Sequence, residues 1–168
     1  VAELGMVNIV FKHNIQNNKS ETFLNGKNVE HDIRGMEVSR YVSFISLIKE
    51  VRSKLVSLQR EMGKDKGIVM DGRDIGTVVF PEAELKIFMT ADNAIRVQRR
   101  FKELYEKNPN VTIEEVKNNL EMRDYIDSHR EVSPLRKATD ALELDNTNLT
   151  EKEQFNKAES QDEKMEIH

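Results

Sequence analysis

The sequence contains no cysteine, and its longest apolar runs are only a few residues. Without cysteine the chain can form neither a disulfide scaffold nor a cysteine-ligated zinc site, which is typical of proteins of the reducing cytoplasm. Because a helix needs about 20 apolar residues to span a bilayer, we expect no transmembrane helix and no membrane partner. The absences therefore predict a globular protein located in the cytoplasm.

An excess of positive charge is also missing. Lys and Arg number 26 against 30 Asp and Glu, so the formal net charge is −4 although 33% of the residues are charged. Nonspecific binding to nucleic acid requires a basic surface, so we expect no nucleic-acid partner. The length of 168 residues suits one domain with a small insert, and a monomer is the default expectation.

The start of the chain has the pattern of a small β-rich lobe. Val7, Ile9 and Phe11 alternate with other side chains along "MVNIVFKHN", which is the period of a half-buried strand. Asn25-Gly26 lies between two short extended pieces and is a typical hairpin turn. We therefore expect a hairpin within the first 30 residues.

One long helix is expected over residues 38–63. Apolar side chains recur there every three or four positions, which predicts a single buried stripe. The predicted stripe comprises Tyr41, Phe44, Ile45, Ile48, Val51, Leu55, Leu58 and Met62.

Three buried strands are predicted from residue 67 onward. "GIVM" (67–70), "ELKIFMTA" (84–91) and "DALELD" (140–145) are short apolar runs without helical periodicity. Helical segments lie before, between and after these strands. This alternation predicts an α/β fold with a parallel sheet.

The predicted helices after residue 91 begin with recognisable N-terminal caps. Asp92 is a predicted N-cap, and Thr112 with Glu115 and Thr150 with Glu153 have the spacing of capping boxes. The last 18 residues are polar and rich in Lys and Glu, which predicts a frayed terminal helix. The predicted core stripe of the helix that follows Asp92 is Val97, Phe101 and Leu104.

Charged residues directly follow the predicted strand "GIVM". Asp71, Gly72, Arg73 and Asp74 stand at its carboxyl end, where α/β sheets bind ligands. Burying such charges is costly unless they are paired. The segment is therefore a self-satisfied ion network, a metal site built on the two aspartates, or a ligand site.

A second cluster consists of Arg96, Arg99 and Arg100, which share one helix face. Three like charges side by side repel one another, and a multiply charged anion such as a phosphate chain would relieve that repulsion. The alternative is an exposed basic face paired with Glu103 and Glu106.

A third cluster continues an apolar stripe of the next helix. Arg123, Asp127 and Arg130 follow Val116 and Leu120 on the same face. These three residues either form an ion-pair ladder on the surface or line a polar cavity. Their position on the buried line favours the cavity.

Several segments together resemble the bacterial cytidylate kinases, a branch of the nucleoside monophosphate kinases. They are "MDGRDIGTVVFPEAELKIFMTA", "RRF", "RD…DSHREVSPL" and "DALELDNT", and the resemblance runs from about Phe23 to about Thr150. It implies an α/β phosphate-loop kinase fold with a parallel sheet core. Residues 1–66 would be the insert that binds CMP, residues 67–168 the remaining core, and about 92–112 the lid.

The resemblance also implies an activity, the transfer of the γ-phosphoryl group of ATP to CMP or dCMP, with Mg²⁺ carried by the nucleotide rather than by the protein. Arg73, with Gly72 beside it, would bind the phosphate of CMP. Asp71 and Asp74 would orient Arg73 and hold water around Mg²⁺. The catalytic residues that the resemblance implies are Arg73, Asp74, Arg96, Arg99 and Arg100.

Recognition of CMP would come from residues far apart in the sequence. By resemblance Ser43, Arg52 and Arg130 face the cytosine, while Arg123 and Asp127 face the ribose. Arginine only donates hydrogen bonds, which matches the acceptors N3 and O2 of cytosine, and the Ser43 hydroxyl can accept from the N4 amine.

Two motifs of the family do not occur in this sequence. They are the glycine-rich phosphate loop and a "DSG…YR" segment, and the seven glycines are scattered. We therefore expect the first strand and helix of the core to be absent from this chain, and the chain by itself to be nearly inactive. The alternatives are a remnant that binds CMP without catalysis and a metal-dependent phosphatase built on Asp71 and Asp74. The latter is disfavoured because no Asp-x-Asp pair is present.

Overall fold

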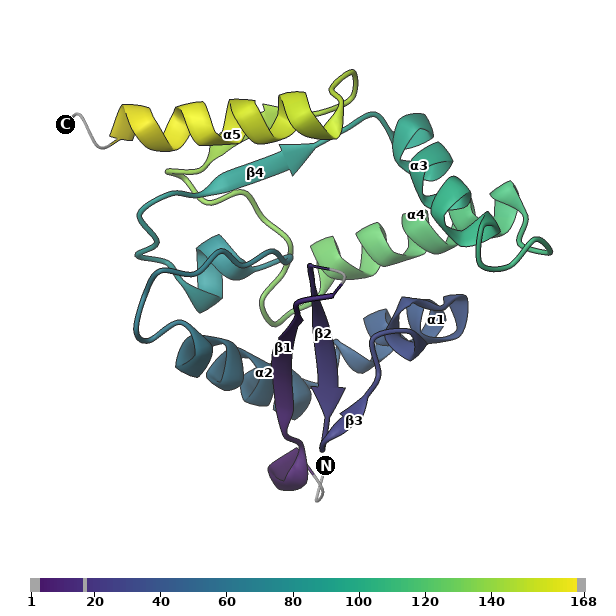
Figure 1. Cartoon of the computed structure of the whole chain (residues 1–168), viewed down its shortest axis with the longest axis horizontal. Helices are drawn as coiled ribbons and strands as arrows, with labels where there is room; N and C mark the ends of the chain where they lie inside the picture. Colours follow the sequence, from purple (N-terminus) through teal and green to yellow (C-terminus); the bar gives the residue numbers. More distant parts are fainter. Residues whose placement is uncertain (1–3, 17, 166–168) are drawn as a thin grey trace.

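The computed structural model describes residues 4–16 and 18–165, so the predictions that fall on residues 1–3, 17 and 166–168 lie outside the described residues. The hairpin sheet, α1 and α2 lie at one end of the molecule, β4 and α5 lie at the other, and α3 and α4 lie along one side (Figure 1). The elements in chain order are η1 (Leu4–Met6), β1 (Ile9–Asn14), β2 (Lys19–Leu24), β3 (Lys27–Asn28), η2 (Asp32–Arg34), α1 (Met36–Ile45), α2 (Lys49–Met62), η3 (Ile75–Val79), β4 (Ile87–Thr90), α3 (Asn93–Tyr105), α4 (Ile113–His129), β5 (Leu142–Asp145) and α5 (Glu151–Met165).

The predicted hairpin is confirmed. Strands β1, β2 and β3 form an antiparallel sheet in that order, and Leu24 pairs with Lys27 across the turn. Asn25 and Gly26 both adopt positive φ, at 49° and 82°. These angles are required at the two central residues of a tight hairpin turn, which explains why Asn-Gly occupies them.

The prediction of a single long helix over residues 38–63 is wrong, because the chain forms two helices that are separated by residues 46–48. The chain leaves helical geometry after Ser46 and reaches extended geometry at Ile48, so α1 and α2 are separate helices. The Ser46 hydroxyl donates to the Ser43 carbonyl at 2.6 Å, and such a local bond competes with the helical hydrogen-bond ladder.

This break also overturns the predicted buried stripe on α1. Tyr41, Phe44 and Ile45 are 63%, 52% and 49% exposed, whereas Ser39 and Ser43 are buried. Because α1 packs on α4, its serine side lies inside and its apolar side lies outside.

The parallel sheet is smaller than predicted. Strands β4 and β5 pair in parallel, with Ile87 opposite Leu142. The segment 67–70 is not a strand, because no described strand lies beside it to take its backbone hydrogen bonds, and Val69 is fully exposed. The α/β class of the chain is nevertheless confirmed, because the described residues combine helices with a parallel strand pair.

The predicted helix caps are confirmed. The Asp92 carboxylate accepts from two backbone N–H groups of the first turn of α3, and Thr112 and Glu115 form a capping box at the start of α4. Thr150 and Glu153 make the same reciprocal bonds at the start of α5. Within residues 4–16 and 18–165, no helix is long and apolar enough to cross a bilayer.

A cluster of buried apolar residues lies between α3 and α4. Leu104, Val111 and Val116 are 3%, 6% and 1% exposed and pack together with Phe101 and Leu120. The cluster ties the two helices to each other, so it positions the polar second half of α4.

Leu104→Ala should lower the free energy of unfolding by about 2–5 kcal/mol, because it removes a buried side chain and leaves a cavity. The measurement is a urea unfolding curve. The control is Leu47→Ala at a residue that is 49% exposed, which should have a much smaller effect. Equal losses in the two variants would contradict the position of this core.

Candidate functional site

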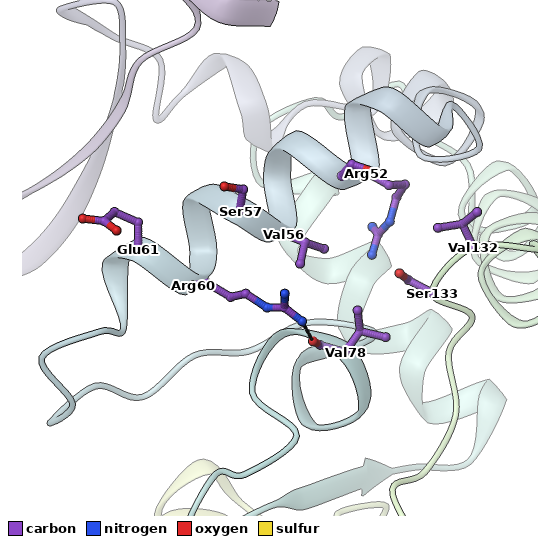
Figure 2. Close-up of a pocket in the computed structure, with 9 residues that line it drawn as sticks. Arg52, Val56, Ser57, Arg60, Glu61, Val78, Val132 and Ser133 are labelled. Atoms are coloured by element: carbon purple, nitrogen blue, oxygen red, sulfur yellow. Dashed lines mark hydrogen bonds between the residues drawn. The ribbon is translucent and has the colours of Figure 1, made fainter.

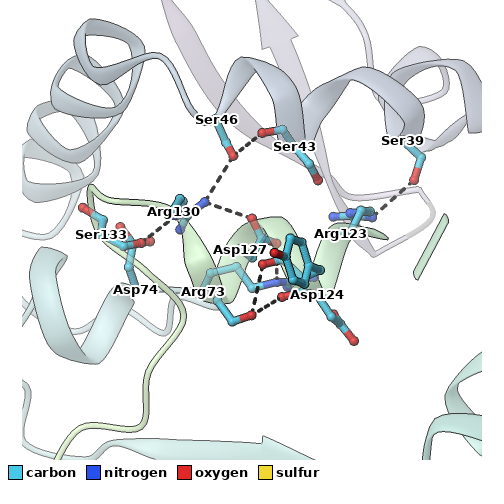
Figure 3. A network of polar contacts seen from close by, with 12 residues as sticks. Ser39, Ser43, Ser46, Arg73, Asp74, Arg123, Asp124, Asp127, Arg130 and Ser133 are labelled. Carbon is cyan, nitrogen blue, oxygen red and sulfur yellow. Dashed lines mark hydrogen bonds and ion pairs between the residues drawn. The ribbon is translucent and has the colours of Figure 1, made fainter. Parts of the chain in front are cut away.

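The candidate site lies where four segments meet. They are the serine side of α1, the start of α2, the loop 71–74 and the second half of α4. Figure 3 shows Ser39, Ser43 and Ser46 facing Arg123 and Arg130, with Asp127 between the two arginines. Asp127 and Arg130 are buried and Arg123 is partly buried, so these residues of α4 lie in a polar cluster rather than on an exposed ladder.

Asp127 stands at the centre of this site. It is 4% exposed and accepts hydrogen bonds from Arg73 Nε at 3.2 Å and from Arg130 at 3.0 Å. Arg123 lies four residues before Asp127 on α4 but makes no ion pair with it among the described residues, and the loop 71–74 brings Arg73 to the carboxylate instead. One buried carboxylate thus joins that loop to the end of α4.

The aspartates of the loop do not hold Arg73 as expected. Asp74 is 4% exposed and pairs with Arg52, the first arginine of α2. Asp71 is exposed. The expectation that Asp71 and Asp74 orient Arg73 is therefore corrected: Asp127 holds Arg73, and Asp74 holds Arg52.

Arg130 is anchored at both ends of its guanidinium group. Its Nε donates to the Ser133 carbonyl at 2.7 Å, and another nitrogen donates to the Ser46 hydroxyl at 3.2 Å. Ser46 belongs to the break between α1 and α2, so this contact depends on the same bend that turns the serines inward.

A contact that the sequence did not suggest comes from Arg60. It lies eight residues after Arg52 on α2 and donates to the carbonyls of Val78 and Val79, at 2.6 Å and 3.2 Å. These carbonyls end η3, a π-helix that begins directly after Asp74. The spacing of Arg52 and Arg60, which places them on one side of the helix, was the feature of the sequence that could have indicated this contact.

A pocket of about 560 Å³ opens between the two arginines of α2 and the loop after α4 (Figure 2). Arg52 and Arg60 lie along one wall, and Val78 and Ser133 lie opposite. The pocket therefore reaches the guanidinium group of Arg52 from the solvent side.

Four buried polar atoms at this site have no hydrogen-bond partner. They are Ser43 Oγ, Arg52 Nε, Arg123 Nε and a terminal nitrogen of Arg130. Among the residues that the structure describes, no other buried side-chain nitrogen or oxygen lacks a partner. Leaving such a group unsatisfied costs about 1–3 kcal/mol each. Their gathering at one place points to a polar ligand.

The electrostatics favour an anion. Three arginines pair with two buried aspartates, and Arg123 lies near Asp127 without pairing with it, which leaves two positive charges in excess. Burial lowers the pKa of Arg123, and the like charge of Arg73 lowers it further. Burial and then the charge of Arg52 lower the pKa of Arg130. The arginines are Arg52, Arg73, Arg123 and Arg130, and the aspartates are Asp74 and Asp127.

The three arginines of α3 have separate partners. Arg96 pairs with Asp124 through two hydrogen bonds, at 2.6 Å and 3.1 Å, and this contact raises the pKa of Arg96. Arg100 pairs with Glu103 at 2.7 Å, one of the two partners expected for an exposed basic face. Both arginines therefore lie in ion pairs in this conformation.

Arg99 differs because its partners are uncharged oxygens, namely the side-chain Oδ1 of Asn146 at 3.1 Å and three backbone carbonyls. It donates to the carbonyls of Asn146, Thr147 and Leu149, at 2.8 Å, 3.1 Å and 3.3 Å. These residues form the connection from β5 to α5. In this conformation Arg99 ties that connection to α3.

The described residues contain no group of three or more His, Cys, Asp or Glu side chains that could hold a metal ion. The pairing of Asp74 with Arg52 further disfavours the phosphatase interpretation, since that carboxylate is already engaged.

Comparison with known proteins gives a consistent result. A family model described as cytidylate kinase matches residues 2–162. Proteins named cytidylate kinase are 56% identical in Flavobacterium johnsoniae, 53% in Flavobacterium psychrophilum and 57% in Bacteroides thetaiotaomicron, over 155, 155 and 148 residues. These alignments cover 92%, 92% and 88% of this chain and 67%, 69% and 65% of the relatives. The chain thus spans about two thirds of the length of these curated relatives.

Asp74→Ala should lower the free energy of unfolding by about 3–5 kcal/mol, because it leaves the buried guanidinium group of Arg52 without its counter-charge. The measurement is chemical unfolding followed by circular dichroism. The control is Asp32→Ala, whose carboxylate is exposed and which should have little effect. A similarly small loss in Asp74→Ala would show that the buried pair does not form.

Proposed function

The chain belongs to the cytidylate kinase family of enzymes, and on this basis we propose that the protein transfers the γ-phosphoryl group of ATP to CMP or dCMP, giving CDP or dCDP. The observation that carries the proposal is the group of four unpaired polar atoms in a site with an excess of positive charge. A nucleoside monophosphate supplies both the missing hydrogen bonds and the negative charge. We assign residues 1–66 to the CMP-binding insert, residues 67–168 to the remaining core, and about 92–112 to the lid.

Base recognition is assigned to Ser43, Arg52 and Arg130. Each has a buried polar atom without a partner, and the three come from α1, α2 and the end of α4. The two guanidinium groups donate to N3 and O2 of cytosine, and the Ser43 hydroxyl accepts from the N4 amine. Uracil carries a donor at N3 and an acceptor at position 4, so it mismatches this set.

The phosphate of CMP is assigned to Arg73. Asp127 binds Nε of Arg73, which leaves the two terminal nitrogens free to form a bidentate contact with a phosphate. The side chain of Arg73 is 39% exposed, so a substrate can reach it. The ribose is assigned to Arg123 and Asp127, which lie between the base-reading and phosphate-binding groups.

Asp127 also supports the use of dCMP. Its carboxylate is paired with Arg73 and Arg130, so it stays neutralised when the 2′-hydroxyl is absent. Loss of one neutral hydrogen bond costs about 1 kcal/mol. We therefore expect dCMP to be a weaker but effective substrate.

The transferring phosphoryl group is assigned to the arginines of α3. Phosphoryl transfer depends on positioning and on neutralisation of charge rather than on covalent chemistry by the protein. The charge of Arg100 contributes to the lowered pKa of Arg123, after burial and the charge of Arg73, which supports a place for Arg100 near the site. Arg96 and Arg99 would exchange their present partners for phosphate oxygens when the lid closes over ATP.

Magnesium is assigned to the nucleotide. Mg²⁺ usually keeps several waters and binds through substrate phosphates with one or two carboxylates, so a protein cage is not required. Asp71 is exposed and suits contact with water around the ion, whereas Asp74 is engaged by Arg52. The ion would neutralise the charge of the phosphates during transfer.

Two measurements test the proposal. Calorimetric titration of this chain with CMP tests the binding site, and a coupled assay of the full-length protein with ATP, CMP and Mg²⁺ tests phosphoryl transfer. Binding without transfer would favour the CMP-binding remnant. Absence of both would refute the proposal.

Arg130→Ala should reduce the preference for CMP over UMP. One mismatched charged group costs about 1.5–3 kcal/mol, so the unaltered protein should prefer CMP by about tenfold to more than a hundredfold. The measurement is kcat/KM for both substrates in the full-length protein. Arg136→Ala, which alters an exposed arginine, is the control and should leave the ratio unchanged. An unchanged ratio in Arg130→Ala would show that this residue does not read the base.

Arg100→Ala should lower kcat at least about tenfold with little change in KM for CMP, because one arginine acting on the transition state supplies ~10³–10⁵ in rate. Arg99→Ala should lower kcat in the same way but less, since Arg99 must first release three backbone carbonyls and the Asn146 side chain. Steady-state kinetics of the full-length protein check both. If either variant raises KM for CMP at constant kcat, its assignment to the transferring group is wrong.

A further inference from the structure

Ser39 and Asn119 form a buried polar contact between α1 and α4 that the proposed function does not use. Ser39 is 5% exposed, and its hydroxyl donates to Asn119 Oδ1 at 2.9 Å. In return, Asn119 Nδ2 donates to the backbone carbonyl of Ser39 at 3.4 Å. Two reciprocal hydrogen bonds thus join residues from two different helices.

The chemistry of these groups determines which one donates and which one accepts in each hydrogen bond. The Ser39 carbonyl only accepts, so Asn119 must turn its NH₂ group toward it. Asn119 Oδ1 then faces the Ser39 hydroxyl and accepts its proton. The hydroxyl oxygen of Ser39 is left with a free lone pair, and this lone pair accepts from Arg123 at 3.3 Å.

Arg123 depends on this contact for its orientation. Among the described residues, Arg123 forms one hydrogen bond, to the Ser39 hydroxyl, and the Nε of Arg123 has no partner (Figure 3). The nearby charge of Arg73 adds to the effect of burial in lowering the pKa of Arg123, so the two guanidinium groups repel each other. Holding an arginine in one rotamer costs conformational entropy. The hydrogen bond to Ser39 therefore determines the orientation of the Arg123 guanidinium group.

We propose that Ser39 and Asn119 are positioning residues that aim Arg123 at the ribose 2′-hydroxyl and thereby set the preference for CMP over dCMP. This inference rests on the proposed function, in which Arg123 faces the ribose. Asn119 orients Ser39, and Ser39 holds Arg123 against the repulsion of Arg73. The base-reading groups Arg52 and Arg130 do not contact this pair, so recognition of the base is independent of it.

Ser39→Ala and Asn119→Ala test the inference in the full-length protein. Each should reduce the ratio of kcat/KM for CMP to that for dCMP by about three- to tenfold, the size of one hydrogen bond, mainly through KM for CMP. The ratio for CMP over UMP should stay within about twofold, since a change of that size is below one hydrogen bond. Ser20→Ala, at an exposed serine of β2 outside the proposed site, is the control and should change neither ratio.

A double-mutant cycle separates positioning from a structural role. In an Arg123→Ala background, Ser39→Ala should have no further effect on the ratio of CMP to dCMP, because the two residues act through one contact. Equal effects of Ser39→Ala with and without Arg123, or loss of thermal stability with both substrate ratios unchanged, would overturn the inference. If the unaltered protein phosphorylates neither CMP nor dCMP, it is the proposed function that fails.

Discussion

The buried carboxylate of Asp127 is the contact on which the candidate site depends. It accepts from Arg73 and Arg130 at once, so it holds the loop 71–74 against the end of α4. The buried pair of Arg52 and Asp74 makes a second link, from α2 to the same loop. Burying Asp74, Asp127 and Arg130 is costly unless they are paired, and each of the three is paired here. In the proposed function, the charge of the nucleotide would balance the two positive charges that are left over.

The break between α1 and α2 determines which side chains face this charge cluster. A continuous helix would have buried its apolar stripe, but the bend at Ser46 turns the serine side of α1 toward α4. Ser39 then reaches Arg123 and Ser46 reaches Arg130, while Ser43 is left with a free hydroxyl. The exposed aromatic residues on the outside of α1 are the other consequence of the same bend.

The arginines of α3 and those near Asp127 differ in how their side chains are paired. Each arginine of α3 has a partner, in an ion pair or with carbonyl oxygens. Arg52, Arg123 and Arg130 each retain a buried nitrogen without a partner among the described residues. In the proposed function, the first group acts on the phosphates of ATP and the second binds the nucleoside monophosphate.

Local spacing in the sequence determined the features that depend on neighbouring residues. The hairpin turn at Asn25-Gly26, the caps of α3 and α4, and the shared face of Arg123, Asp127 and Arg130 all follow from dihedral preferences and helical periodicity. Likeness to a known family then identified the class of enzyme.

Only the tertiary structure decided which charged groups pair and where the chain bends. Asp74 is next to Arg73 in the sequence but pairs with Arg52, and Arg73 crosses to Asp127. Ser39 and Asn119 are 80 residues apart, so no local pattern could have joined them. The segment 67–70 has the composition of a strand, yet it lacks a neighbouring strand among the described residues. Pairing across long separations depends on the path of the chain in space, which propensity and spacing do not determine.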